Sequence, residues 1–315
     1  MISVFLYGDK ATDSALVHLK GMTELEWLDL RDTKIGDGGL EHIKGLTKLE
    51  YLSLNTRIGD AGLKHLQELD KLQELFLADT NVGDAGLKHL RKLTNLRSIN
   101  LRNTKVGNAG LEQLKGLVKL EKLRLENTRV TDAGLIHLTG MVKLESLILY
   151  GTKVGDAGLA QIKRLRRLRS LHLANTKVTD AGLEYVGGLE LLYLSLAATA
   201  VSDVGLSHLK GMTTLDTLLL NNTKVTDAGL KHIEGLKLQY LWLAATAVSD
   251  VGLSHLKGMT TLESLTLDNT KITDAGLKHL EKLSKLKSLH LGGTKVTDAG
   301  VKKLQAALPK CNVYH

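Results

Sequence analysis

Histidine has the most regular spacing among the residue types that can bind a metal or transfer a proton. It recurs within a GLxHL-like pattern at nine positions, which are His18, His42, His65, His89, His137, His208, His232, His255 and His279. Zinc holds nitrogen ligands at about 2 Å. The spacing places these histidines on successive short helices, which are expected to lie about 8–10 Å apart. We therefore expect a structural or solvated role for them and no metal site.

The other reactive side chains do not form a catalytic set. Cys311 is the single cysteine, so no intramolecular disulfide is possible, and its spacing from Leu308 and Val313 predicts burial in a terminal half-repeat. No base is predicted beside it, and no Ser/His/Asp set or phosphate-binding glycine loop has the required spacing. His172 and His290 fall five predicted strands apart and cannot act as a pair. The sequence predicts a non-catalytic protein that uses no cofactor.

These residues belong to a repeat of 24 or 23 residues that runs along the 315-residue chain. The pattern LxxLxLxxTxVxDAGLxxLxxL marks thirteen units. Its first part alternates apolar and polar residues, as in Leu28-Asp29-Leu30, which predicts a strand buried on one face. Its second part spaces apolar residues three apart, as at Leu40 and Ile43, which predicts a short helix. One unit cannot bury its own leucines, whereas stacked units share a continuous core.

Across its length the chain resembles the leucine-rich-repeat family, especially the bacterial "TDAGL" repeats and the cysteine-containing and ribonuclease-inhibitor-like classes. One departure is Thr, from Thr33 to Thr294, where those families usually have Asn or Cys; its hydroxyl is expected to bond the neighbouring turn. The resemblance implies an α/β, right-handed solenoid (a horseshoe) with a one-layer parallel sheet on the concave face and short helices on the convex face. It also implies a single domain over residues 1–315, of about thirteen repeats, that acts as a binding scaffold.

Aromatic residues concentrate at strand positions predicted to face the concave side. They make up only 3% of the chain, and nine of the eleven fall at these positions. Their β-propensity alone favours such positions, but Trp and Tyr exposed on a rigid face also tend to dominate interfaces. We predict that two aromatic groups, a charged belt and their neighbours bind a partner, through Trp27, Tyr51, Phe76, Arg102, Arg124, Tyr150, His172, Tyr193, Leu219, Tyr240 and Trp242.

The net charge of +8 does not lie on this face. The concave positions carry six acidic and four basic residues, whereas a column after the recurring Thr is basic at Lys34, Arg57, Lys105, Arg129, Lys153, Lys177, Lys224, Lys271 and Lys295. This basic rim is an alternative site for a polyanion. It lacks the stacking aromatics typical of nucleic-acid binding, so we prefer a protein or peptide ligand. A third reading is the substrate-recognition part of a larger effector enzyme.

The helix starts and the two ends carry further expectations. The Asp before each helical pattern, such as Asp37, is expected to be the N-cap. The first strand, within Ile2–Tyr7, is apolar on both faces, which predicts an open edge that pairs with a second copy or is covered in a longer chain. Residues 301–315 are expected to form a cap, with a helix ended by Pro309 and a strand closed by Cys311 and Val313.

Hydropathy gives no indication of a membrane segment. No apolar run approaches the roughly 18 residues of a membrane span. The sequence start, MISVFLYGDK, lacks the basic and apolar regions of a signal peptide. A cytoplasmic location is therefore favoured.

Overall fold

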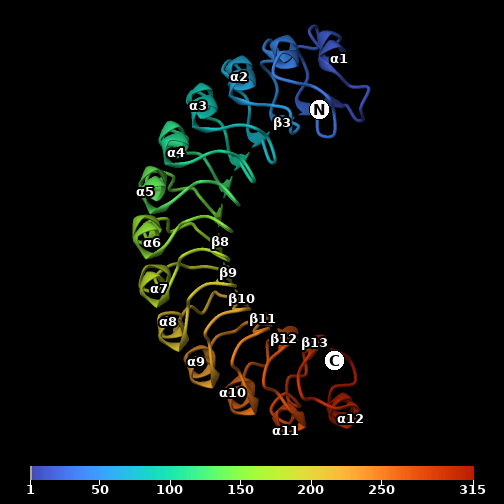
Figure 1. Cartoon of the computed structure of the whole chain (residues 1–315), viewed down its shortest axis with the longest axis vertical. Coiled ribbons are helices and arrows are strands. Elements are labelled where there is room, and N and C mark those ends of the chain that lie inside the picture. The colour runs from blue at the N-terminus through green and yellow to red at the C-terminus, as the bar shows by residue number, and fades with distance from the viewer. Residues whose placement is uncertain (1) are drawn as a thin grey trace. The chain divides into compact units, whose positions relative to one another are not determined.

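The computed structural model describes residues 2–315, which divide into two units (Figure 1). Unit 1 contains the residues up to Val154 together with Arg164–Leu168, and unit 2 contains Gly155–Lys163 and Arg169–His315. Within each unit, strands line the inner side and short helices the outer side. The α/β solenoid with a parallel sheet is thereby confirmed. That residues 1–315 form a single domain stays a prediction.

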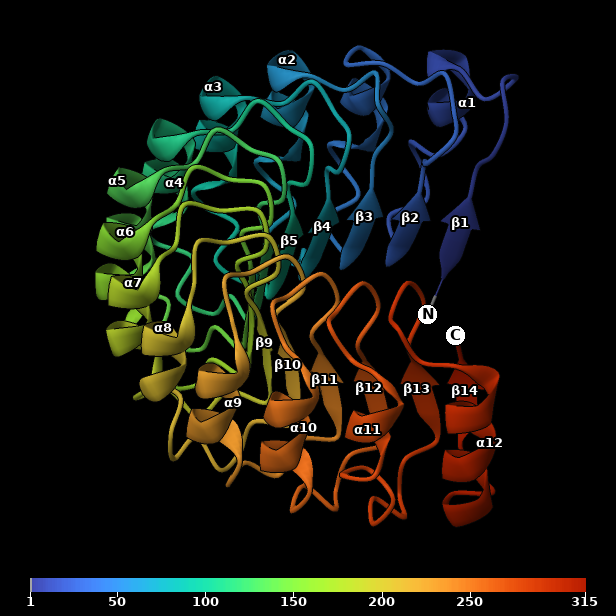
Figure 2. The ribbon, with the colours of Figure 1, turned by 60° about the horizontal axis from the view of Figure 1, so that its bottom comes forward.

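The strands of unit 1 pair in parallel, each with its neighbour in sequence, as the arrows of Figure 2 show. They are β1 (Ser3–Phe5), β2 (Trp27–Asp29), β3 (Tyr51–Ser53), β4 (Glu74–Phe76), β5 (Ser98–Asn100), β6 (Lys122–Arg124) and β7 (Ser146–Ile148). The α-helices are α1 (Asp13–Val17), α2 (Asp60–Leu63), α3 (Asp84–Leu87), α4 (Asn108–Leu114) and α5 (Asp132–Leu135), and the 3₁₀ turns are η1 (Gly39–Ile43), η2 (Lys64–Leu66), η3 (Lys88–Leu90) and η4 (Ile136–Leu138).

Unit 2 follows the same plan, again with parallel pairing between successive strands. Its strands are β8 (Ser170–His172), β9 (Tyr193–Ser195), β10 (Thr217–Leu219), β11 (Tyr240–Trp242), β12 (Ser264–Thr266), β13 (Ser288–His290) and β14 (Asn312–Tyr314). Its helices are α6 (Asp156–Ile162), α7 (Asp180–Val186), α8 (Asp203–Ser207), α9 (Asp227–Ile233), α10 (Asp250–Leu256), α11 (Asp274–Leu277) and α12 (Asp298–Ala307).

The core between strands and helices is aliphatic. The three leucines of each LxxLxL segment point into it, as Leu25, Leu28 and Leu30 do with no exposed surface. Because side chains of a strand alternate between faces, the residues between these leucines must point to the opposite, concave side. The repeat therefore fixes which side chains a partner can reach.

The Asp at each helix start is not the N-cap, so that prediction is wrong. At α2 the N-cap is Gly59, whose backbone is extended (φ −125°, ψ −166°) as capping requires, and Asp60 is the first helical residue. The Asp60 carboxylate instead accepts the backbone N–H of Gly83 in the next repeat, at 2.6 Å. We call this recurring hydrogen bond the aspartate tie, because it joins each repeat to the following one.

The aspartate tie is doubled in most repeats of unit 2. There the N-cap is Thr or Ser, and its hydroxyl donates to the same carboxylate as its N–H. Thr226 donates to the two oxygens of Asp203 at 2.7 Å from the N–H and 2.6 Å from the hydroxyl. Ser202 donates to Asp180 at 2.7 and 2.6 Å in the same way. Glycine caps cannot supply the second bond.

The recurring Thr of the strand-end turns also differs from expectation. Its hydroxyl donates within its own turn, as Thr33 does to the Leu30 carbonyl at 2.8 Å, and not to a neighbouring turn. The three-residue spacing brings donor and acceptor together inside one tight turn, so no second repeat is needed. Asn55 is different, because its amide donates to the preceding turn at Ile35 O, 2.9 Å away.

The two ends of the chain agree in outline with their expected forms. In the C-terminal cap, α12 precedes Pro309, Cys311 is buried, and β14 pairs with β13. At the other end, β1 pairs with β2, and Phe5 and Tyr7 are exposed and stacked on each other. Self-association through β1 stays a prediction.

Candidate functional site

The parallel register aligns equivalent strand positions into rows on the concave face of each unit. In unit 1 the two central rows are Trp27, Tyr51, Glu74, Ser98, Lys122 and Ser146, and Asp29, Ser53, Phe76, Asn100, Arg124 and Ile148. In unit 2 they are Ser170, Tyr193, Thr217, Tyr240, Ser264, Ser288 and Asn312, and His172, Ser195, Leu219, Trp242, Thr266, His290 and Tyr314.

Unit 1 carries an aromatic stack formed by Trp27, Tyr51 and Phe76. The rings of Trp27 and Tyr51 are parallel with centroids 3.4 Å apart, and the Phe76 ring lies 5.1 Å from Tyr51. Tyr51 is consequently only 8% exposed. Burial raises the pKa of its hydroxyl, and the nearby Asp29 carboxylate adds to that rise. The three predicted site residues therefore do come together, but mostly against one another.

Unit 2 carries an aromatic patch formed by Tyr193, Leu219, Tyr240 and Trp242. Tyr240 is 39% and Trp242 40% exposed, whereas Leu219 is buried between neighbouring strands. His172 stacks on Tyr193 with ring centroids 4.2 Å apart. Burial raises the pKa of the Tyr193 hydroxyl, and a hydrogen bond with Ser195 opposes that rise. The patch thus combines covered residues with two large rings that face solvent.

The predicted charged belt consists of ion pairs rather than free charges. Arg102 Nη2 lies 2.7 Å from Asp79 and Arg124 Nη2 2.6 Å from Glu126. A third arginine, Arg31, makes a bidentate pair with the buried Asp29. Hydrogen bonding to Asp79 raises the pKa of Arg102. Each guanidinium is therefore held in place by a carboxylate of its own unit.

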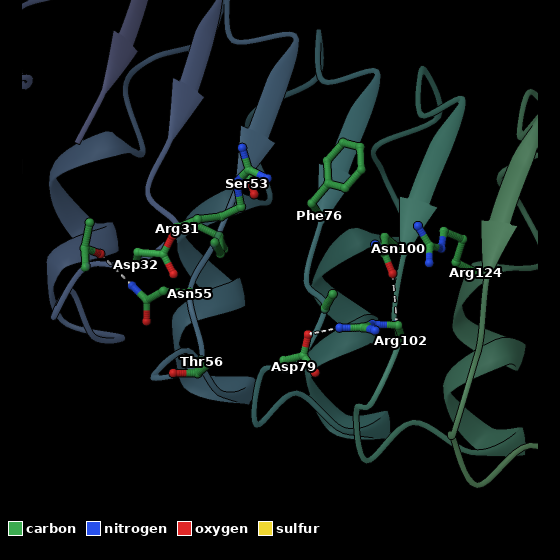
Figure 3. A pocket seen from close by; sticks show the side chains of 13 residues that line it. Arg31, Asp32, Ser53, Asn55, Thr56, Phe76, Asp79, Asn100, Arg102 and Arg124 are labelled. Carbon is green, nitrogen blue, oxygen red and sulfur yellow. Dashed lines mark hydrogen bonds and ion pairs between the residues drawn. The ribbon is translucent and has the colours of Figure 1, made fainter. Parts of the chain in front are cut away.

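A pocket of about 480 Å³ opens on the concave side of unit 1, at the ends of its strands (Figure 3). Its lining includes Arg31, Arg102 and Arg124, with Phe76 and Ser53 between them. We call it the strand-end pocket. Sequence reasoning found two of its arginines but not the pocket, although the short third repeat beside it was a visible signal.

Polar atoms are unusually isolated around the aromatic stack. Among residues 2–315, Trp27 Nε1, Ser53 Oγ and Glu126 Oε2 are buried side-chain atoms without a hydrogen-bond partner. Ser53 is close enough to Tyr51 to oppose the rise of its pKa, yet its Oγ makes no hydrogen bond of normal geometry. Since buried polar groups are normally paired, this surface has unused hydrogen-bonding capacity.

Two aromatic residues lie outside these groups. Tyr150 is exposed just after β7 in unit 1, so its predicted membership of the unit 2 patch stays a prediction. Tyr314 was missed by sequence reasoning, and it stacks on His290 with centroids 4.7 Å apart. Extending the strand register into the terminal half-repeat would have found it.

The histidine column and the cysteine show no catalytic arrangement. Within residues 2–315, no three His, Cys, Asp or Glu side chains gather as metal ligands would. Burial lowers the pKa of His65 and His89, which favours their neutral form. Burial raises the pKa of the Cys311 thiol, which disfavours a reactive thiolate.

None of the helices within residues 2–315 combines the length and apolar character that crossing a bilayer requires.

The comparisons with known proteins agree with the architecture. A family model described as Leucine Rich repeat matches residues 22–44, 92–115, 165–187, 258–280 and 282–304. The chain is similar to an internalin (inlF) of Listeria monocytogenes, with a TM-score of 0.60 and 24% identity over 94% of this chain and 82% of that one. A leucine-rich-repeat protein of Leptospira interrogans gives 0.65 and 20% over 100% and 90%. PEPR1-AtPEP1 gives 0.58 and 17% over 99% of this chain and 43% of that one. No curated protein matches significantly.

Proposed function

Because the chain is a leucine-rich-repeat protein, we propose that it is a non-catalytic scaffold that binds a protein or peptide on its concave face. Leucine-rich repeats commonly serve as protein-binding scaffolds, and solenoids use their extended concave surfaces for this purpose. The observation that carries the proposal is the exposure of Tyr240 and Trp242 on a single strand.

The setting of these two rings favours binding over a purely structural role. Strand β11 is paired on both sides, with β10 and β12, so its backbone is fixed before a partner arrives. Thr217 and Thr266 lie beside the two rings in the register and are small, which leaves the rings accessible. Binding then immobilises few rotatable bonds, and large rings that lose water on a rigid surface are typical interface anchors.

The test compares two double variants in an affinity capture with quantitative mass spectrometry. Tyr240→Ala with Trp242→Ala removes the exposed rings, whereas Val204→Ala with Val251→Ala removes equally accessible apolar groups, both 64% exposed, from α8 and α10. We expect the first variant to lose the partner and the second to retain it, with both still folded by circular dichroism. Full affinity of the first variant for every captured partner would contradict the proposal.

Polyanion binding through the basic rim is the second candidate. Isolated parallel bridges at Lys105 and Lys153 in unit 1, and at Lys224, Lys271 and Lys295 in unit 2, hold members of this column in a regular order. A polyanion on the rim would lose affinity steeply with added salt, whereas aromatic contacts would not. A salt titration of any captured partner therefore separates the two candidates.

The third alternative differs in consequence rather than in the binding face. If the chain recognises substrates for a larger effector enzyme, the same concave residues would select the substrate. The proposal to test first is therefore the concave face.

A further inference from the structure

The third repeat of unit 1 has a shorter strand-end turn than its neighbours. Four residues separate Leu30 from Ile35 and Leu77 from Val82, but only three separate Leu54 from Ile58. In the neighbouring turns one residue has a left-handed backbone, Asp32 with φ 57° and Asp79 with φ 62°. The third turn has one residue fewer to fill the corresponding space.

Asn55 holds this short turn against the preceding one. Its amide donates to Thr33 Oγ1 and to Ile35 O, both at 2.9 Å, and its Oδ1 accepts the N–H of Arg57 at 2.8 Å. The side chain is 5% exposed, so it fills the interior and not the outer space. The strand-end pocket lies at this place, with Asp32, Thr56 and Asp79 among its lining residues.

The walls of the pocket are rich in hydrogen-bond donors. Arg31 and Arg124 each use Nε and Nη2 for their own carboxylates, and Arg102 uses Nη2. Among the residues that the structure describes, no acceptor is bound to Nη1 of these three arginines. Buried Ser53 adds a hydroxyl without a partner. Acceptors, by contrast, are already engaged: Asp79 accepts from Asn103 and Arg102.

The ion pairs decide what kind of ligand these donors suit. Since Asp29, Asp79 and Glu126 offset the three guanidinium charges, the pocket offers directed donors and no large positive field. A long polyanion gains little from such a site, whereas one compact group with several acceptor atoms can bond several N–H groups at once. The volume of about 480 Å³ suits a side chain or a small group.

We propose that the strand-end pocket binds one oxyanion group of the partner, a carboxylate or a phosphate, between Arg31, Arg102 and Arg124. The group accepts hydrogen bonds from the unused guanidinium N–H groups, and its attached chain packs on the Phe76 ring. This inference deepens the proposed function and depends on it for its biological role, since the oxyanion belongs to the protein or peptide held on the concave face.

The test follows the arginine Nε–Hε signals of the full chain by NMR while capped tripeptides are added. The probes are Ac-Gly-Glu-Gly-NH2, its isosteric neutral counterpart Ac-Gly-Gln-Gly-NH2, and Ac-Gly-phosphoSer-Gly-NH2. We expect saturable shifts at Arg31, Arg102 and Arg124, with the glutamine peptide binding about tenfold more weakly than the better anionic peptide. Whichever anionic peptide binds more tightly identifies the source of the oxyanion.

Two variants separate the pocket from general charge. Replacing Asn55 by an Ala-Asp pair, Asn55→Ala-Asp, reproduces the turn sequence of Leu77–Val82, keeps all three arginines and should close the pocket and abolish the shifts. Arg124→Gln should weaken binding by about tenfold, whereas Arg91→Gln, which lies outside the pocket lining, should change nothing.

Several results would overturn the inference. Equal binding of the glutamine and glutamate peptides, no saturable shift with either anionic peptide, or unchanged binding after Asn55→Ala-Asp in a folded protein would each do so. The Tyr240→Ala, Trp242→Ala variant should retain the peptide shifts, because its residues lie outside the pocket. Failure of the concave aromatic anchors is thus distinguishable from failure of the pocket.

Discussion

The concave faces of the two units use the same strand positions for opposite purposes. In unit 1, Trp27, Tyr51 and Phe76 stack on one another, and charged side chains pair around them. In unit 2, Tyr240 and Trp242 stand exposed beside small neutral residues. Since the leucine core is the same in both, the difference shows that the outward strand positions vary independently of the fold.

The contrast separates rings that stabilise from rings that bind. Neighbours in the register decide which role a ring takes, because a strand holds each side chain beside its equivalent on the next strand. Tyr51 has a ring on either side, whereas Trp242 lies between Leu219 and Thr266. An aromatic row therefore turns inward on itself, and an isolated aromatic remains available.

The largest expected effect is on stability within unit 1. Tyr51→Ala should lower the free energy of unfolding by about 3 kcal/mol, because it removes a covered ring and leaves a gap in the stack. Tyr240→Ala should lower it by about 1 kcal/mol or less, since much of that ring already faces water. Urea denaturation of both variants measures the difference. Equal losses would erase the distinction between the two faces.

The next effect is on binding and should have the opposite order. Trp242→Ala should weaken a captured partner by about 2 kcal/mol, roughly thirtyfold, if the ring is an interface anchor. Trp27→Ala, corrected for any loss of folded protein, should change affinity less, because its ring is engaged with Tyr51. Titration calorimetry with the purified partner gives both values. A larger loss for Trp27→Ala would reverse our assignment of the two groups.

The aspartate ties offer a third comparison of the units. Thr226→Gly removes the second bond to Asp203 and should cost about 1 kcal/mol. Gly83→Thr should do the reverse in unit 1, with a gain of about 0.5 kcal/mol or more. The space exists, because a Cβ at Gly83 would lie 3.5 Å from Asp60 Oδ2 and 3.7 Å from Lys105 Cβ. Thermal unfolding that shows destabilisation by Gly83→Thr would refute the doubled tie as a source of stability.

The smallest effect concerns the paired charges of unit 1. Hydrogen bonds from Asn103 and Arg102 lower the pKa of Asp79. A lowered carboxylate pKa contributes stability above the unfolded value of about 3.9, and the contribution is lost as the pH falls through the folded value. The side chain is 41% exposed, so solvent screening limits the contribution to less than about 1 kcal/mol.

The measurement compares the wild type with Asp79→Asn in denaturant at pH 7 and at about pH 2. The wild type should be slightly more stable at pH 7, and the two should converge in acid. A difference that stays constant with pH would show that the Asp79 charge contributes nothing.

The sequence predicted which face each strand residue occupies but not how much of it is covered. Alternation places Tyr51 and Tyr240 on the same face, and only the neighbouring strands show that one is covered and the other exposed. The role of Asp60 was missed for a similar reason, because its acceptor bond reaches a residue in the next repeat. The strand-end pocket required knowledge of three adjacent turns, whereas the pattern of one turn shows only a missing residue.

The aspartate tie also bears on how the chain is built during translation. The donor that completes each tie arrives 22 or 23 residues after its carboxylate, as in the bonds of Asp37 with Gly59 and Asp60 with Gly83. At a synthesis rate of about 5–20 residues per second, a ribosome supplies one such donor every few seconds. Each emerging repeat can thus seal the one before it, which gives nascent-chain folding a fixed direction from the first repeat to the last.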